Sequence, residues 1–355
     1  MFLAYKEIIH NKARYLLVMA TFVLIAYLVF FLTGLATGLA RNNRTAIDAL
    51  PGNYVLLSKY ANKNLLSSTL SADQITKVSK VSNKHTAVLG QVAVVAESTA
   101  NDKKVNSNVF GINLNGKLKP TVTSGHLPIH HNEVLADDSV TIYGLHQGDR
   151  ITLNGSSQTY RIVGLTHDRR FYTVPVFYTT LGTFRQLKFG QRQVKQASAV
   201  ISTKPFKNIP AKTQSISKAT LVENIPGYTA ETSTFALMIG AMIGIMLLII
   251  GIFMYILTIQ KIAMYGVMRA QGIRTRAIIA ALFWQILMLA VTGVAIGAGL
   301  LGLTQFILPK AMPFYANLPL FIAIAAALIL MSLVGGLFSL RRILHIDPLA
   351  AIGGE

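Results

Sequence analysis

Cysteine is absent from this 355-residue chain, which excludes disulfides and thiolate metal sites, so every folded part must be stable by packing alone. Acidic residues are scarce, because 14 Asp and Glu stand against 33 Lys and Arg, a formal net charge of +19. Charge is also missing from the middle of four long apolar runs, and 52% of all residues are hydrophobic. A chain this apolar is not one water-bounded domain, and we expect a membrane protein.

The four apolar runs are each long enough to cross a bilayer as a helix, since a helix rises about 1.5 Å per residue and the hydrocarbon layer is roughly 30 Å thick. The first run is longer than the apolar part of a signal peptide and has no A-x-A-like cleavage site, so we expect it to remain attached. The predicted transmembrane helices are residues 15–40, 235–259, 277–307 and 318–340.

Basic residues close to the ends of the spans predict the orientation, because such residues stay on the cytoplasmic side. These residues are Lys6, Lys12 and Arg14 before the first span, Lys261, Arg269, Arg274 and Arg276 after the second, and Arg341 and Arg342 after the fourth. Both termini and a loop over 260–276 are therefore expected in the cytoplasm. Residues 1–14 are predicted to form an amphipathic helix and 346–355 a tail.

Residues 41–230 are then expected outside the cell as a mixed α+β domain. Runs rich in β-branched and aromatic residues predict strands at 54–57, 87–95, 108–112, 150–153, 160–165, 174–178 and 197–201. Ser71 and Gln74 have capping-box spacing, and 181–188 also has a helical pattern. Asn154-Gly155 predicts a hairpin, Pro51 should end the first helix, and 202–230 is expected to be a return segment to the membrane.

Nucleotide-binding and catalytic motifs are not legible in the sequence. The segment Gly111-Ile-Asn-Leu-Asn-Gly-Lys-Leu118 comes within one residue of a P-loop, but Leu118 has no hydroxyl for Mg²⁺, and a turn between strands explains its glycines. His130 and His131 are adjacent and point to opposite faces of a strand, so we expect no metal site there. We predict a non-catalytic subunit, with any ATP hydrolysis on a separate chain.

The basic loop carries a specific resemblance. Gly266-Val-Met-Arg-Ala-Gln-Gly272 resembles the coupling segment of FtsX-like ABC transporter permeases, written G-hydrophobic-hydrophobic-basic-A-hydrophobic-G. Gln271 departs from that pattern, and Met264-Tyr265 stands where many members carry an acid. Without the resemblance, the basic residues are explained by anchoring on the cytoplasmic side. The ending Arg341-Arg-Ile-Leu-His-Ile-Asp-Pro-Leu-Ala-Ala351 is similar to the C-terminal ending of the family.

Within the polar insert, Glu133-Val-Leu-Ala, Gly144 to Leu153 and Tyr160 to Gly164 are similar to the extracytoplasmic core domain of MacB-like permeases. The segment Phe31 to Asn42 resembles the haem-export permeases of Gram-positive bacteria. The resemblance implies a type VII ABC permease in the cell membrane, with four transmembrane helices and residues 231–345 as the FtsX-like domain. It also implies a homodimer that binds two copies of a cytoplasmic ATPase subunit. This assembly is expected to remove haem from the outer leaflet.

Two sets of residues are expected to form the contacts of this assembly. Those assigned to the ATPase interface are Tyr265, Gly266, Met268, Arg269, Gly272, Arg274 and Arg276. Those assigned to close helix packing, with dimerisation through the first and second spans, are Gly34, Gly38, Gly240, Gly244, Gly293 and Gly297. The remaining expected partners are membrane lipids and haem, with no nucleic acid.

Haem needs an apolar slot and an axial donor, and this chain offers Tyr, His and Met but not Cys. Glu231 at the outer entrance of the second span is unusual, because an acid close to hydrocarbon costs free energy. Tyr228 precedes it, and Met238 and Met242 follow one and two turns further in. The alternative is an exposed carboxylate that the dipole of a helix N-terminus favours.

A second candidate group for haem lies in the insert. Tyr172 and Tyr178 stand near Arg169 and Arg170, whose charges suit haem propionates, and the alternative is an ordinary pair of strands. Two other functions remain open. One is export of another amphiphile, such as a lipid, lipopeptide or antimicrobial peptide. The other is signalling to a cell-wall hydrolase without transport, as in the cell-division members of the family.

Overall fold

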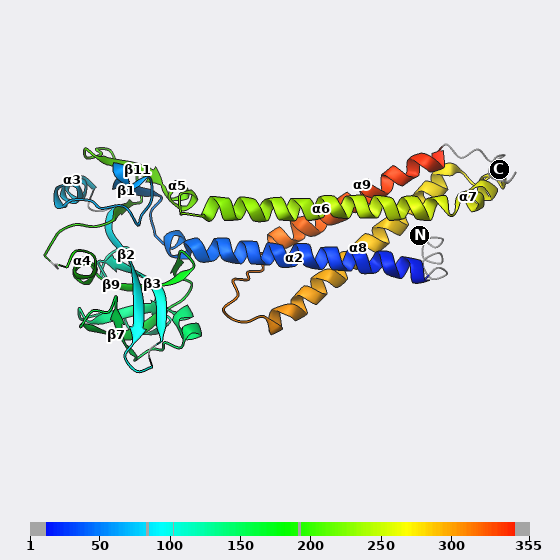
Figure 1. Ribbon diagram of the computed structural model, residues 1–355. Coiled ribbons are helices and arrows are strands. Elements are labelled where there is room, and N and C mark those ends of the chain that lie inside the picture. Colours follow the sequence, from blue (N-terminus) through cyan, green and yellow to red (C-terminus); the bar gives the residue numbers. More distant parts are fainter. Residues whose placement is uncertain (1–11, 83–84, 102, 191–192, 345–355) are drawn as a thin grey trace. The chain divides into compact units, whose positions relative to one another are not determined.

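The computed structural model describes residues 12–82, 85–101, 103–190 and 193–344, drawn in colour in Figure 1. The predicted N-terminal helix over 1–14 lies almost entirely outside these residues, as does the tail over 346–355. The chain divides into two compact units, one made of residues up to Gly38 and from Ser233 onward, the other of Leu39–Thr232.

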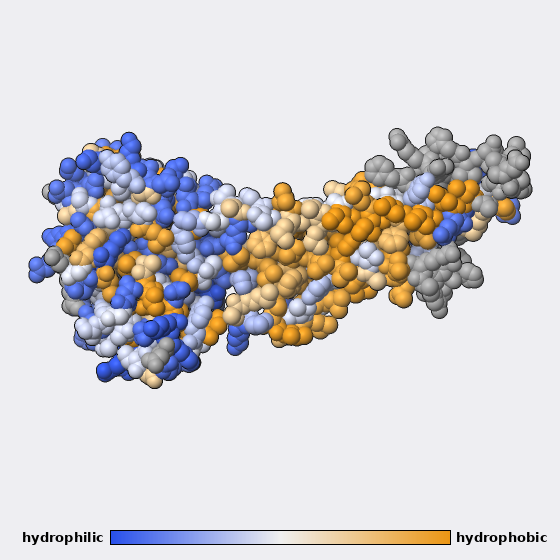
Figure 2. Space-filling view, in the orientation of Figure 1, coloured by the Kyte–Doolittle hydropathy of each residue, from blue (hydrophilic) through white to orange (hydrophobic). Residues whose placement is uncertain are grey.

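The first unit is a helical membrane domain. Its helices are α7 (Ile262–Ala270), α8 (Thr275–Ile307), α9 (Leu318–Leu344) and most of α2 (Lys12–Asp48) and α6 (Tyr228–Ile259), the last turns of α2 and the first turn of α6 belonging to the second unit. All except α7 are long and apolar enough to cross a membrane, which confirms the predicted four-helix class. Apolar side chains cover this part of the chain in Figure 2. Helix α2 runs two turns beyond the predicted span and ends at Asp48, three residues before Pro51, which cannot continue a helix.

Glycines set the closest helix contacts in the membrane unit. A Cβ on Gly293 would lie 2.6 Å from the Phe22 side chain, and one on Gly297 would lie 2.9 Å from Ala26. These two glycines therefore let α8 pack directly on α2. Helices α6 and α9 make a close contact that the small-residue pairs did not predict, since a Cβ on Gly335 would lie 2.6 Å from the carbonyl oxygen of Leu247.

The glycine pair of the first span serves a different contact from the one predicted. Gly34 and Gly38 do not face another helix but the segment between α8 and α9, where a Cβ would meet Phe314 or the Pro313 carbonyl oxygen at 2.2 Å. The Tyr315 N–H donates to the Gly34 carbonyl at 3.0 Å, and the Thr37 hydroxyl donates to the Tyr315 carbonyl at 2.7 Å. Gly240 and Gly244 on α6 are exposed and have open space on their Cβ side.

The second unit is built on one mixed sheet. Its strands are β1 (Tyr54–Ser58), β2 (Thr86–Ser98), β3 (Lys104–Ile112), β4 (Ser124–Gly125), β5 (Glu133–Asp137), β6 (Arg150–Leu153), β7 (Thr159–Thr166), β8 (Arg170–Phe171), β9 (Val174–Thr180), β10 (Ala199–Ser202) and β11 (Thr213–Ser217). The order is β11-β1-β10-β2-β3-β9-β5-β7-β4, with β6 beside β2 and β7, and β8 beside β9. The helices are α3 (Ala72–Ser82), α4 (Leu181–Phe189) and α5 (Lys218–Glu223), with 3₁₀ turns η1 (Lys59–Ala61) and η2 (Asp138–Tyr143).

Most local predictions for this unit are confirmed. The Ser71 N–H donates to Gln74 Oε1 at 2.9 Å and the Gln74 N–H donates to Ser71 Oγ at 3.4 Å, which is the predicted capping box. Asn154 and Gly155 have φ values of 53° and 63° in the turn that joins β6 to β7. The expectation for 202–230 is incomplete, because this return segment contains β11 and α5. Strand β11 pairs with β1 from Tyr54↔Ser217 to Ser58↔Thr213.

Candidate functional site

The candidate site lies where the last turns of α2 meet the first turn of α6, all within Leu39–Thr232. Asn43 Nδ2 donates to Glu231 Oε2 at 2.9 Å, and Arg44 Nη1 donates to the Tyr228 hydroxyl at 3.3 Å. Arg44 Nε also forms an ion pair with Asp48 at 2.7 Å. Glu231 lies in the first turn of α6, where the helix dipole favours a negative charge.

A loop of the sheet holds this end of α2 in place. The N–H groups of Tyr172 and Thr173 donate to the carbonyls of Asn43 and Asn42, each at 3.2 Å. Tyr172 and Thr173 have φ values of 57° and 63°, a left-handed conformation that a tyrosine and a β-branched threonine rarely adopt. The Arg170 N–H donates to Thr45 Oγ1 at 2.9 Å. The loop therefore positions the asparagine that contacts Glu231.

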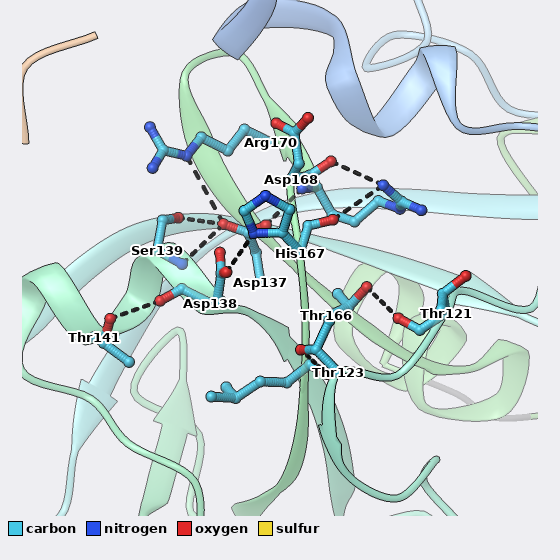
Figure 3. Close-up of polar contacts among 12 residues, drawn as sticks. Thr121, Thr123, Asp137, Asp138, Ser139, Thr141, Thr166, His167, Asp168 and Arg170 are labelled. Carbon is cyan, nitrogen blue, oxygen red and sulfur yellow. Dashed lines mark hydrogen bonds and ion pairs between the residues drawn. The ribbon is translucent and has the colours of Figure 1, made fainter. Parts of the chain in front are cut away.

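Asp137 at the end of β5 fixes the same loop from the other side (Figure 3). Its carboxylate is fully buried and accepts hydrogen bonds from the Ser139 N–H at 3.1 Å, the Ser139 hydroxyl and the Arg169 N–H at 2.5 Å. Arg170 Nε lies 3.8 Å from the carboxylate. Burial raises the pKa of Asp137, although the hydrogen bonds of Ser139 and Arg169 oppose that shift.

Two further ion pairs lie near this buried carboxylate, one exposed and one half-buried. His167 Nδ1 lies 2.6 Å from Asp138 Oδ2, and this hydrogen bond raises the pKa of His167. Arg41 of α2 pairs with Asp168 of the loop. The loop thus joins α2 by one ion pair and three backbone hydrogen-bond donors.

The structure brings together only part of the predicted haem set. Tyr228 and Glu231 meet the end of α2, and Tyr172 lies in the loop that binds Asn43. Tyr178 does not belong to this group, because it is 3% exposed in the core and packs edge-on against Phe110. Burial also raises the pKa of Tyr178. Met238 is 42% exposed on α6, whereas Met242 packs against the core of the helical unit.

Asn43 and Arg44 supply the contacts to Glu231 and Tyr228, and neither was among the predicted site residues. The segment Phe31 to Asn42, which resembles haem-export permeases, ends directly before Asn43 and could have pointed to both residues. Asn43 and Glu231 lie at opposite ends of the insert, 188 residues apart in the sequence, and only the fold brings them together. Sequence spacing does not reveal such a contact.

Helix α7 has a different orientation from the one expected for a partner-binding helix. Tyr265 is 4% exposed, and Ile262 and Met268 pack against the core of the helical unit. Met264 and Val267 are 44% and 45% exposed. Tyr265 therefore anchors α7 to its own chain, and the free face carries Met264 and Val267.

Comparison with known proteins shows what the chain is similar to. The FtsX-like permease C-terminal family model matches residues 236–348. The "putative hemin transport system permease protein HrtB" of Staphylococcus epidermidis is 29% identical over 362 residues, which cover 99% of both chains. The protein of the same description from Staphylococcus haemolyticus is 28% identical over 360 residues, again with 99% of both chains covered.

Two further matches extend the comparison. An uncharacterised ABC transporter permease of Mycobacterium tuberculosis is 24% identical over 361 residues, with 100% of this chain and 99% of the relative covered. The crystal structure of the extracellular domain of the ABC-type transporter YknZ from Gram-positive bacteria covers 43% of this chain and 83% of its own, at a TM-score of 0.31 and 12% identity. Residues 236–348 thus match the FtsX-like permease C-terminal domain, and the chain as a whole is similar from end to end to ABC transporter permeases.

Proposed function

We propose that this chain is the permease subunit of an ATP-driven ABC exporter that removes haem from the outer leaflet of a Gram-positive cell membrane. The chain itself hydrolyses no ATP, which is the work of two copies of a cytoplasmic ATPase subunit, and both termini lie in the cytoplasm. The full-length similarity to proteins described as hemin transport permeases supports the substrate. The open face at Gly240 and Gly244 supports a second copy of the chain packed along α6.

The observation that carries the proposal is the placement of Glu231 at the start of α6. Among the described residues, its carboxylate has a hydrogen bond from Asn43 and no ion pair with a cation. An acid at the entrance of a membrane helix is a functional candidate by default. On one helix, spacings of seven and four residues place Glu231, Met238 and Met242 on a common face.

The residues around Glu231 fit haem as a substrate. The Tyr228 hydroxyl and the two methionines are donors of the types that ligate haem iron. Arg44 beside Tyr228 offers a guanidinium to a propionate. Tyr172 is suited to donate a hydrogen bond rather than to bind as a phenolate, because burial raises its pKa to about 12. Tyr178 takes no part in this proposal.

A haemin titration of the purified full-length chain in detergent tests the site. We expect a saturable Soret shift, and we expect Glu231→Gln and Tyr228→Phe each to weaken binding at least about tenfold, since each removes a group that contacts haem or aligns the contact. Glu223→Gln is the matched control, because this exposed acid lies on α5 only eight residues away.

The titration also separates the competing functions. If the intact protein gives no Soret shift, haem is not the substrate, and export of another amphiphile or signalling to a wall hydrolase takes its place. If Glu231→Gln binds as tightly as the intact protein, haem binds elsewhere on the chain. A loss of binding in Glu223→Gln equal to that in Glu231→Gln would show a general effect of charge.

The exposed face of α7 is the proposed contact with the ATPase. We expect Val267→Asp to abolish co-purification of the proposed ATPase subunit, because a carboxylate would replace an apolar side chain at the interface. Ile209→Asp is the control, since Ile209 is 49% exposed in the insert. Retention of the ATPase by the Val267 variant would place the contact elsewhere.

A further inference from the structure

Positive charge is concentrated on one part of the insert. Residues 53–86 and 181–223, which we call the basic lobe, form α3, α4, α5, β1, β10 and β11. The basic lobe holds 13 Lys and Arg against two acids, Asp73 and Glu223. The remainder of the sheet domain, residues 87–180, holds eight basic and seven acidic residues. General solubility does not require such an imbalance, because mixed charge serves it equally well.

Three of these cations have structural roles inside the lobe. Lys188 Nζ donates to the carbonyls of Gln91 at 3.2 Å and Ser68 at 3.4 Å, and burial lowers its pKa to about 8. Arg185 Nε donates to the Gln196 carbonyl at 3.1 Å. Lys218 Nζ donates to the carbonyls of Asp48 and Leu50. These side chains stabilise the fold and are not available to a partner.

Seven other cations of the basic lobe are exposed lysines: Lys59, Lys63, Lys77, Lys195, Lys204, Lys207 and Lys212. In the described part of the chain, the ion pairs involve none of them. All seven are lysines, and a lysine ammonium binds phosphate as a hydrated point charge, without the planar geometry that arginine imposes. Such a set suits a flexible partner with many anionic groups.

Two of these lysines, Lys59 and Lys212, lie together at one end of the sheet, whereas Lys204 follows β10 at the end where Ser202 pairs with Tyr54. The Lys59 N–H donates to the Lys212 carbonyl at 2.9 Å, and Gln74 Nε2 at the start of α3 donates to the Ala211 carbonyl at 3.0 Å. Turn η1, the segment before β11 and helix α3 therefore meet. Lys59 follows the last residue of β1 and Lys212 precedes the first residue of β11, so both lie at the end of this strand pair opposite the residues that follow α2. In Figure 2 hydrophilic residues cover the region of α3, β1 and β11.

We propose that the basic lobe binds a phosphate-bearing polymer on the outer side of the membrane. The excess of cations matches a partner of high negative charge density. Lys59 and Lys212 lie at one end of the β1–β11 pair and Lys204 near the other, so the charge is spread along the lobe, which suits an extended polymer. This inference goes beyond haem export and uses no residue of the proposed haem site.

Binding of linear polyphosphate to the full-length chain in phosphatidylcholine nanodiscs tests the proposal. The variant Lys59→Gln, Lys63→Gln, Lys207→Gln, Lys212→Gln removes four charges from the lobe. The control Lys103→Gln, Lys104→Gln, Lys117→Gln, Lys119→Gln removes four charges from exposed lysines of residues 87–180. We expect the lobe variant to bind at least about tenfold more weakly at low salt. The slope of log Kd against log salt should fall by about 3, at roughly 0.7 for each lost contact, and the control should change neither value.

Other probes decide between occupants. Preference for dextran sulfate over polyphosphate at equal charge would overturn the assignment to phosphate. Tighter binding to phosphatidylglycerol vesicles than to polyphosphate would assign the lobe to a lipid surface instead. Equal losses in the two variants, or no binding by the intact protein, would refute the proposal. Retained haemin binding in the lobe variant shows that it is folded, and it keeps this result separate from failure of the haem site.

Discussion

Asp137→Ala should destabilise the insert by about 3–5 kcal/mol, because the change removes the acceptor described for the N–H groups of buried Ser139 and half-buried Arg169 and leaves a guanidinium without its carboxylate. The carboxylate accepts from the N–H groups of Ser139 and Arg169, and Arg170 Nε lies 3.8 Å away. Asp137→Asn keeps one acceptor oxygen in the same shape and should cost less, about 1–3 kcal/mol. The free energy of unfolding is measured on the full chain by denaturant titration, followed by limited proteolysis of the insert.

The neighbouring acid is the control for this prediction. Asp138 binds His167 on the surface, where His167 is 72% exposed, so Asp138→Asn should cost less than about 1 kcal/mol. The Asp137 variant should also show faster hydrogen exchange at the N–H groups of Tyr172 and Thr173, because Asp137 holds the loop that bonds to α2. If the Asp137→Ala protein is as stable as the Asp138→Asn protein, Asp137 does not hold the loop.

Gly297→Leu should disrupt the packing of α8 on α2. A Cβ at this position would lie 2.9 Å from the Ala26 Cβ and 3.0 Å from the Tyr27 backbone nitrogen, and neither atom can move without the helix. Overpacking of this kind costs about 1–3 kcal/mol, and a rigid backbone puts the cost at the upper end or beyond. The expected result is a lower midpoint of thermal unfolding in detergent, with loss of folded protein at the temperature where the unmodified chain is stable.

Gly299 provides a matched control on the same helix. It is exposed, and a Cβ there would have nothing within 4 Å. Both substitutions gain the same helix propensity over glycine, about 0.8–1.0 kcal/mol, so their difference isolates the steric contact. If Gly297→Leu and Gly299→Leu unfold at the same temperature, α2 and α8 do not pack through Gly297.

The membrane spans and most strands follow from sequence patterns that have a direct physical cause. An uncharged run longer than the bilayer has few alternatives to a spanning helix, and a helix long and apolar enough to cross a membrane forms at each of the four predicted places. The hairpin at Asn154-Gly155 and the cap at Ser71 are equally local, because a few neighbouring residues determine each of them. Strand β11 was missed because its segment contains several polar residues and follows Pro205 and Pro210.

The candidate site was only half predictable for a different reason. Glu231 stands out as an acid next to hydrocarbon, which is a local signal, whereas Asn43 is an ordinary polar residue whose importance depends on the fold. Tyr178 was included in the haem group although it packs against Phe110, because an alternating strand pattern does not say which face of β9 is buried. Tyr265 was assigned to a partner since the pattern of α7 does not distinguish its buried face from its free face.

Strand pairing at the edge of the sheet also determines how the domain responds to force. The chain enters β1 after α2 and leaves β11 toward α6, and the pair Tyr54↔Ser217 joins these two attachment points. Traction that draws the two attachment points apart therefore acts on the antiparallel ladder from one end, so that its five residue pairs open in succession like a zipper and never share the load in shear. Mechanical opening of the domain would begin at Tyr54 and reach Ser58 last.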